Sequence, residues 1–328
     1  MSLEKNHILK SKKIRLGITM GDSSGIGPEI LSCVLNKIKI FKDVEFVVIA
    51  DAWVLYKFPI KEKNFKLIDL KNVPRKNFSF GKISPHYARA SIEYLEEATR
   101  LLKNKELDCL VTLPITKESW DKSGFFWHGH TEYLADSFGV KDVTMMLMNR
   151  YIKTALVTKH LALKKVPSVI TKEKICQTII STEQGLRNWF GIKRPKIAVC
   201  ALNPHASDGG LFGDEEKRII IPSIRNVRRK IKATVEGPFP CDALFLKAKQ
   251  RVYDGIIAMY HDQALIALKL SDFSHGVNIT LGLPFVRTSP LHGSALDIAG
   301  KGKASYLPLW EAIRVAVNCT RYQMVSKQ

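Results

Sequence analysis

Short apolar runs alternate with longer amphipathic stretches along almost the whole chain. Apolar runs bounded by polar or turn residues are typical of buried strands, and they predict strands at 14–19, 44–50, 109–113, 153–158, 196–202, 255–260 and 277–281. Helical periodicity predicts helices at 28–38, 85–103, 172–190, 215–232 and 309–318. Strands that alternate with helices predict an α/β architecture with a largely parallel sheet. Ser84 and Thr171 precede two of these helices, where a hydroxyl can cap the first turn.

Polar or Gly/Pro-rich segments follow six of the predicted strands. They begin at residues 20, 114, 159, 203, 261 and 282. In open α/β sheets ligands bind at the carboxyl ends of the strands. We therefore expect these six segments to line one cleft.

Three histidines, His160, His205 and His261, stand one to three residues after a predicted strand. Neutral imidazoles bind zinc and similar divalent ions, and three of them leave coordination positions open. A single histidine is more often structural, so it is their shared position that points to a metal. Asp262 adjoins His261 and can orient it or act as a base, as can Asp242. Asp242 is equally suited to cap a helix at 243–249.

Several segments suit an anionic ligand. The hinge GDSSGIGPE at 21–29 can hold an anion on its backbone amides or can simply form a tight turn. Lys269, Asn278 and Arg287 flank His261 and the last predicted strand, and a guanidinium binds phosphate or carboxylate well. The glycines of 289–305 allow the backbone to approach a ligand closely.

Composition narrows the class of protein. The chain has 328 residues, no apolar run long enough for a membrane span and no signal-peptide pattern at its start. Its six cysteines are scattered without a CxxC pair, which favours a reducing cytoplasm. The net charge of +20 is spread along the chain without a nucleic-acid-binding motif. We therefore expect phosphorylated small molecules as partners, no specific nucleic acid and no membrane.

Together these motifs resemble the 4-hydroxythreonine-4-phosphate dehydrogenase family, in the family's order and across most of the chain. The matching stretches are ITMGDSSGIGPE, LVTLPITKES, GHTEYLA, VTKHLALKKV, ALNPHASDGG, EGPFPCDALF, YDGIIAMYHDQALIALK and GVNITLGLPFVRTSPLHGSALDIAGKGKA.

The resemblance implies roles for individual residues. His160, His205 and His261 match the family's metal ligands, one of which comes from a partner subunit, so that a homodimer with its active site at the subunit interface is implied. The implied substrate-binding residues are His130, Thr131, Lys269, Asn278 and Arg287. HGSALDIAGKGKA is also similar to the adenosine-binding loop of isopropylmalate dehydrogenases, and the implied cofactor residues are Gly293, Ser294, Ala295 and Asp297.

The implied fold has two α/β/α domains around a cleft, is similar to isocitrate and isopropylmalate dehydrogenases, and is not a Rossmann fold. Residues 1–128 with 285–328 would form the terminal domain, which carries the cofactor loop. Residues 129–284 would form the central domain with the metal site and the dimer interface.

The implied activity is oxidative decarboxylation of 4-phosphohydroxy-L-threonine to 3-amino-2-oxopropyl phosphate, a step in vitamin B6 biosynthesis. It would need NAD or NADP and one divalent ion (zinc, magnesium or cobalt), with Asp242 and Asp262 as the candidate catalytic groups. Three alternatives stay open: a dehydrogenase of another phosphorylated hydroxy acid such as 4-phosphoerythronate, a zinc hydrolase that uses the three histidines to activate water, and a nucleic-acid-binding protein.

Overall fold

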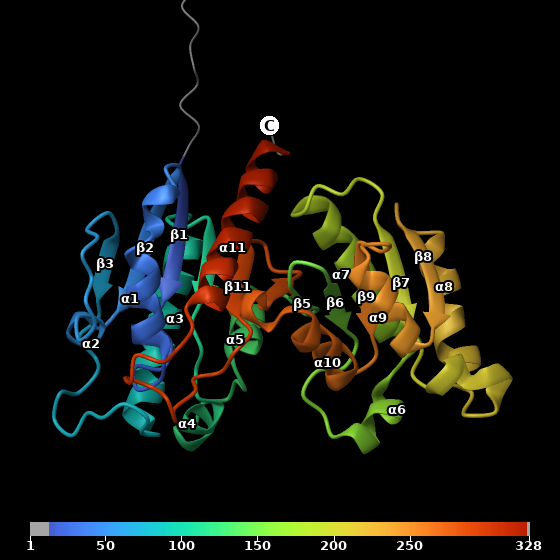
Figure 1. Cartoon of the computed structure of the whole chain (residues 1–328), viewed down its shortest axis with the longest axis horizontal. Coiled ribbons are helices and arrows are strands. Elements are labelled where there is room, and N and C mark those ends of the chain that lie inside the picture. Colours follow the sequence, from blue (N-terminus) through green and yellow to red (C-terminus); the bar gives the residue numbers. More distant parts are fainter. Residues whose placement is uncertain (1–12, 327–328) are drawn as a thin grey trace, which may run out of the picture.

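The computed structural model describes residues 13–326, and a single mixed sheet of eleven strands runs through this part of the chain (Figure 1). Its strand order is β3-β2-β1-β4-β11-β10-β5-β6-β9-β7-β8. The strands are β1 (Ile14–Thr19), β2 (Val44–Ala50), β3 (Lys66–Asp69), β4 (Cys109–Thr112), β5 (Thr144–Met148), β6 (Lys153–Leu156), β7 (Lys196–Cys200), β8 (Thr234–Phe239), β9 (Gly255–Ala258), β10 (Val277–Leu281) and β11 (Val286–Pro290).

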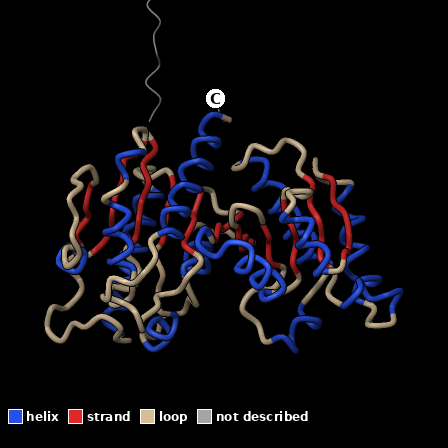
Figure 2. The backbone as a smooth tube through the Cα atoms, viewed as in Figure 1, coloured by secondary structure: helices blue, strands red, loops and turns tan. Residues whose placement is uncertain are grey.

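Helices flank the strands along the whole sheet (Figure 2). The α-helices are α1 (Gly27–Leu35), α2 (Ala52–Leu55), α3 (Pro85–Lys103), α4 (Lys117–Lys122), α5 (His130–Ser137), α6 (Val166–Val169), α7 (Lys172–Asn188), α8 (Ile221–Arg228), α9 (Cys241–Lys249), α10 (His261–Asp272) and α11 (Leu307–Val325). Short 3₁₀ or π turns are η1 (Ile38–Ile40), η2 (Leu163–Lys165), η3 (Pro204–Gly210), η4 (Glu216–Ile220) and η5 (Phe273–His275). No helix within residues 13–326 is long and apolar enough to cross a membrane.

The sheet consists of two parallel wings joined by antiparallel strands. β3, β2, β1, β4 and β11 pair in parallel, as do β6, β9, β7 and β8. Between the wings, the pairs β11–β10, β10–β5 and β5–β6 are antiparallel, so the prediction of a largely parallel sheet misses this centre. Sheets twist by roughly 20–25° per strand. We attribute to this twist that the carboxyl ends of β4 and β6, which belong to different wings, lie on the same side of the molecule. The helices α4 and α6, which follow these two strands, both lie on the lower side in Figure 1.

Burial explains why the central strands form. Every residue of β4, β5, β9 and β11 is buried, because helices and loops cover both faces of the sheet. A second apolar cluster, which includes Leu147, Ile256 and Leu268, fills the space between the right-hand wing and the helices α9 and α10.

The predicted elements are present, mostly with small shifts, but the helix predicted at 309–318 runs to Val325 as α11, and the helix predicted at 215–232 is η4 followed by α8, which ends at Arg228. β1, β2, β10 and α3 have the predicted bounds, whereas β4, β6, β7 and β9 end one or two residues earlier. The Thr171 side chain caps α7 by accepting a hydrogen bond from the Lys174 amide. Ser84 occupies the N-cap of α3 but its side chain makes no capping bond, which corrects that prediction. Residues 1–12, where the sequence predicts no signal peptide, lie outside the described residues.

Candidate active site

A cavity of about 280 Å³ opens where β4, β6 and β11 end, beside β5, β10 and the first turns of α5 and α10. It brings together seven residues that the sequence predicts for the site, from segments far apart in the chain. Its lining includes His130, Thr131, His160, His261, Asn278, Arg287 and Gly293, together with Thr112, Lys117, Glu132 and His292.

Arg287 is the principal cation of this cavity. It lies in β11, between β4 and β10, and its side chain is almost wholly buried. Its Nη1 donates to the Thr280 hydroxyl at 3.0 Å and its Nη2 to the Thr112 hydroxyl at 2.6 Å, while Nε has no partner within the described chain. Burial lowers the pKa of Arg287 to about 10, so the guanidinium is charged at neutral pH. A buried guanidinium whose hydrogen bonds go to neutral hydroxyls, with a longer-range attraction to Glu132, is suited to receive an anion.

His130 and Thr131 begin α5, where the chain turns into the cavity. The His130 ring packs edge-on against Trp120, with ring centroids 5.6 Å apart. Its Nε2 is buried and has no partner among residues 13–326. Burial, with the nearby charges of Arg287 and Lys117, holds the pKa of His130 well below its usual range. The imidazole is therefore neutral and has one nitrogen free for a ligand.

Two further polar atoms in the cavity wall are buried without a partner in the described chain: Asn278 Oδ1 and His292 Nε2. The His292 Nδ1 lies 3.2 Å from the Gly293 carbonyl, so it donates there and leaves Nε2 as an acceptor. Sequence reasoning missed His292 as a site residue because it treated this segment as a cofactor loop. Unpartnered buried polar atoms are costly, and four of them around one space mark a ligand site.

His160 and His261 meet at the mouth of the cavity, with ring centroids 5.3 Å apart. The His261 Nδ1 lies 2.7 Å from Asp262 Oδ1, which leaves His261 Nε2 free, as in carboxylate–histidine–metal arrangements. Lys117 Nζ lies 3.3 Å from His160 Nδ1. Burial and the Lys117 charge lower the pKa of His160, so its imidazole also stays neutral.

Seven of the predicted residues do not line the cavity: His205, Asp242, Asp262, Lys269, Ser294, Ala295 and Asp297. His205 is exposed in η3, beside Phe212 with ring centroids 6.3 Å apart, and Lys269 is exposed on α10. Neither lines the cavity, and nor does Asp242. Asp242 lies inside the first turn of α9, which begins at Cys241, so it does not occupy the N-cap. Among residues 13–326 of a single chain, no group of three or more metal-ligating side chains is assembled.

The two glycine-containing loops lie against each other. The Ser294 carbonyl accepts a hydrogen bond from the Ile26 amide at 3.0 Å, and the Ser294 hydroxyl bonds to Thr116. Ala295 has a left-handed backbone and Asp297 is exposed nearby. The predicted cofactor segment thus packs on the start of α1.

The hinge before α1 is a tight turn. Gly21 has a φ of +71°, and a Cβ there would lie 2.3 Å from the Pro114 carbonyl oxygen. The amides of Ser24, Gly25 and Ile26 are all bonded within the protein. These amides are therefore not free to hold an anion, and the turn interpretation of this motif is the one that fits.

The mixed sheet and the cavity define an α/β protein with a cationic, histidine-lined ligand site among its central strands. The chain belongs to the family of the pyridoxal phosphate biosynthetic protein PdxA, whose family model matches residues 27–316.

Relatives match over nearly their full length. A 4-hydroxythreonine-4-phosphate dehydrogenase of Sulfurihydrogenibium is 42% identical over 318 residues, which cover 93% of this chain and 98% of the relative. A relative from Oceanobacillus iheyensis, provisionally named D-threonate 4-phosphate dehydrogenase, is 37% identical over 94% of this chain and 98% of its own. The crystal structure of the 4-hydroxythreonine-4-phosphate dehydrogenase of Klebsiella pneumoniae superposes with a TM-score of 0.83 at 33% identity, covering 94% of this chain and all of that one.

Proposed function

We propose that this protein oxidises and decarboxylates 4-phosphohydroxy-L-threonine to 3-amino-2-oxopropyl phosphate, with NAD or NADP and a divalent ion, in vitamin B6 biosynthesis. The observation that carries the proposal is the set of unpartnered buried atoms around one cavity: Arg287 Nε, His130 Nε2, Asn278 Oδ1 and His292 Nε2. A small ligand with an anionic group, an amine and a hydroxyl would satisfy all four.

The roles of the cavity residues follow from their chemistry. Arg287 binds the phosphate or the carboxylate of the substrate. Asn278 Oδ1 and His292 Nε2 accept hydrogen bonds, which suits a protonated amine or a hydroxyl, and Thr131 adds a hydroxyl to the same wall. The neutral His130 holds or exchanges one proton through Nε2. Asp262 fixes the tautomer of His261, and Asp242 stays a candidate base only if substrate or partner brings it closer.

The residues present fit a divalent ion. His160 and His261 are adjacent imidazoles, and Asp262 leaves His261 Nε2 available as a ligand. His205, the third ligand implied by the resemblance, is exposed, which suits a ligand supplied to the site of another subunit. When bound, zinc, magnesium or cobalt would act as a Lewis acid on the substrate hydroxyl, and the nicotinamide would take the hydride.

We propose a homodimer that forms through α10. Ile266, Leu270 and Phe273 are large apolar side chains that α10 and η5 leave 61%, 84% and 47% exposed. Such a contiguous apolar face on a charged protein is typical of a subunit interface. Lys269 lies on the same helix, so the dimer would place this lysine near the cavity of the partner subunit. This placement would explain why Lys269 does not line the cavity of its own chain.

We also propose the two-domain, non-Rossmann arrangement of isocitrate and isopropylmalate dehydrogenases, with residues 1–128 and 285–328 in one domain and 129–284 in the other. The strand order supports this division, because β11 of the terminal part meets β10 of the central part at a single antiparallel ladder. Gly293, Ser294, Ala295 and Asp297 would bind the adenosine portion of the cofactor. A cytoplasmic location is supported by the cysteines, which are all free.

A turnover assay tests the activity. Purified protein is stripped of metal with a chelator, then supplied with 4-phosphohydroxy-L-threonine, NAD or NADP, and zinc, magnesium or cobalt in turn. We expect reduced nicotinamide and carbon dioxide in equal amounts, and only after a metal is returned. Turnover that survives chelation, or no turnover with any combination, would contradict the proposal.

The second candidate is a dehydrogenase of another phosphorylated hydroxy acid, which is favoured by the provisional name of the Oceanobacillus relative. The same assay with D-threonate 4-phosphate and 4-phosphoerythronate separates the two. These acids lack the amine, so a higher kcat/KM on either than on 4-phosphohydroxy-L-threonine would favour the second candidate.

A further inference from the structure

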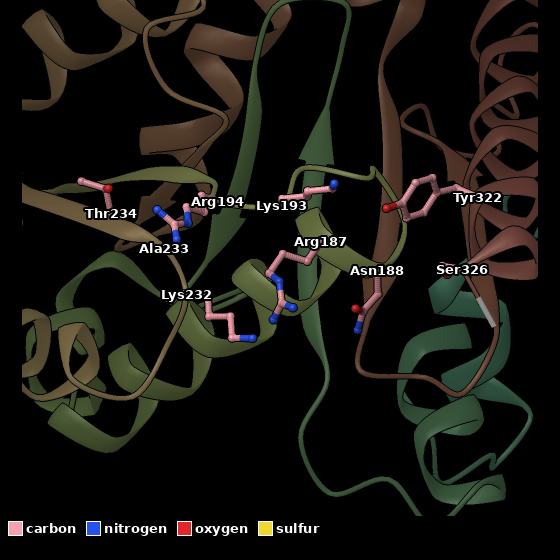
Figure 3. A pocket seen from close by; sticks show the side chains of 9 residues that line it. All are labelled: Arg187, Asn188, Lys193, Arg194, Lys232, Ala233, Thr234, Tyr322 and Ser326. Carbon is pink, nitrogen blue, oxygen red and sulfur yellow. The ribbon is translucent and has the colours of Figure 1, made fainter. Parts of the chain in front are cut away.

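A second and larger cavity, of about 740 Å³, lies at the amino ends of β7 and β8, between α7 and the end of α11 (Figure 3). It shares no lining residue with the candidate active site. Its walls come from both wings of the sheet, because α11 packs on β11 and β4 while α7 packs on β5 and β9. The activity proposed above gives this space no role.

Positive charge dominates this basic cavity. Arg187, Lys193, Arg194 and Lys232 line it, and no acidic residue does. Within the described chain only Arg187 has an ion-pair partner, Glu183, whose carboxylate lies 3.2 Å away. In Figure 3 the side chains of Arg187 and Lys232 extend to the same side of α7.

The positive charge exceeds what the protein itself balances. Glu183 neutralises one of the four cations. The C-termini of α7 and α8 lie beside Arg187 and Lys232, and each helix end supplies roughly half a negative charge. An excess of about two positive charges remains in the cavity. Such an excess concentrates anions, and it does so most strongly for multiply charged ones.

Neutral donors and an aromatic ring complete the wall. The side chains of Asn188 and Thr234 can donate hydrogen bonds to phosphate oxygens, and Ser326 also lines the wall. Tyr322 enters from α11, opposite α7, and its ring rests on Gly191, where an added Cβ would lie 2.6 Å from a ring carbon. The ring is therefore held in place, and it offers a flat surface beside the cations.

We propose that the basic cavity binds an oligophosphate, either inorganic or the phosphate chain of a nucleotide. Its volume exceeds what a single phosphate fills, and its cations come from three separate segments, as required to contact several phosphoryl groups at once. The lining is poorly suited to bind a metal ion, because it contains no carboxylate.

Titration calorimetry with inorganic tripolyphosphate on the full chain, at about 0.15 M salt to screen weak surface attraction, tests the proposal. We expect one site per chain. The double variant Arg194→Glu/Lys232→Glu should lose about tenfold or more in affinity, because two attractive contacts become repulsive. Lys63→Glu is the matched control: this exposed lysine lies just before β3, at the opposite edge of the sheet, and we expect less than a twofold loss.

Binding that is unchanged in Arg194→Glu/Lys232→Glu, or weakened equally by Lys63→Glu, would overturn the proposal. The variant Arg287→Met separates the two cavities, and loss of tripolyphosphate binding in that variant would also overturn it. A second titration with adenosine triphosphate distinguishes the sources. If adenosine triphosphate and tripolyphosphate bind with equal affinity, the cavity recognises the phosphate chain alone. If adenosine triphosphate binds more tightly and Tyr322→Leu removes this difference, the nucleotide stacks on the Tyr322 ring. Both outcomes support an oligophosphate site.

Discussion

Arg287→Met is the substitution that best separates binding from stability in this protein. Arg287 is buried in the middle of the sheet, where it donates hydrogen bonds to the hydroxyls of Thr112 and Thr280 and is further stabilised by the charge of Glu132. Methionine keeps the unbranched shape of the side chain and removes the charge. We expect the variant to lose its anion site while it keeps its fold.

Two opposing terms set the effect on stability. Burial lowers the pKa of Arg287 to about 10. This shift means that burial disfavours the charged form of the side chain by roughly 3 kcal/mol. The two hydrogen bonds to hydroxyls return a similar amount, about 1.5 kcal/mol each for a charged donor. The substitution removes both terms, so the free energy of unfolding should change by less than about 1 kcal/mol.

Ligand binding should respond very differently. Loss of two charge-assisted hydrogen bonds to a phosphate or carboxylate costs about 3 kcal/mol, which is a loss of affinity of roughly a hundredfold or more. Urea unfolding gives the first quantity, and calorimetric titration of 4-phosphohydroxy-L-threonine gives the second. Arg15→Met is the control, because Arg15 pairs with Asp108 at 2.8 Å; breaking a paired charge should lower stability by about 1 to 2 kcal/mol and leave ligand affinity unchanged.

A destabilisation of Arg287→Met by more than about 3 kcal/mol would refute this reasoning, because it would mean that the protein itself satisfies the buried charge. Unchanged ligand affinity would remove Arg287 from the binding site. Either result would leave the four unpartnered atoms without a common explanation.

Three further substitutions address the metal, the hinge and the dimer. Asp262→Asn should weaken divalent-metal affinity by about 10- to 100-fold, because it loosens the orientation of His261; metal titration by calorimetry measures this. Gly21→Ala should lower the free energy of unfolding by about 3 kcal/mol in urea, because its backbone is left-handed and a Cβ meets the Pro114 carbonyl. Leu270→Asp should convert a dimer to a monomer in light scattering, because it places a charge in the exposed apolar face of α10.

Each of these has a matched control. Asp272 forms a similar pair with a histidine outside the cavity, at 2.8 Å from His275, so Asp272→Asn should not change metal affinity. Gly209 has a φ of +70° but open space around its Cβ position, so Gly209→Ala should cost only about 1 kcal/mol. Ile40 is 66% exposed far from α10 in sequence, and Ile40→Asp should leave the molecular mass unchanged. Equal effects in a variant and its control would contradict the specific explanation for that variant.

The sequence did not predict β3, β5, β8 and β11, and two of these strands, β5 and β11, show the physical reason. β5 reads TMMLM, and methionine and leucine favour helices in isolation, yet burial between β10 and β6 makes this segment a strand. β11 reads VRTSP, without an apolar pattern, and forms because β4 and β10 offer free backbone edges on either side. Pairing with distant strands decides both, and local composition does not contain that information.

Sequence motifs located most of the candidate site. His130, Asn278 and Arg287 were predicted from their motifs, and all three line one cavity. The sequence could not indicate that His292 has a buried nitrogen without a partner in the described chain, or that Lys269 is exposed and does not line the cavity. Those outcomes depend on side-chain directions that only packing fixes.

By itself the sequence determined the α/β class, the positions of most strands and many of the residues that line the cavity, because apolar periodicity and motif chemistry are local properties. The tertiary structure decided which of these residues share a space. The parallel pairing of β6 with β9 brings His160 to His261. The packing of α7, α11 and the segments before β7 and β8 gathers four cations from three segments into the basic cavity. Such meetings arise from the pairing of strands distant in the chain and from the twist of the sheet, neither of which any single stretch of residues encodes.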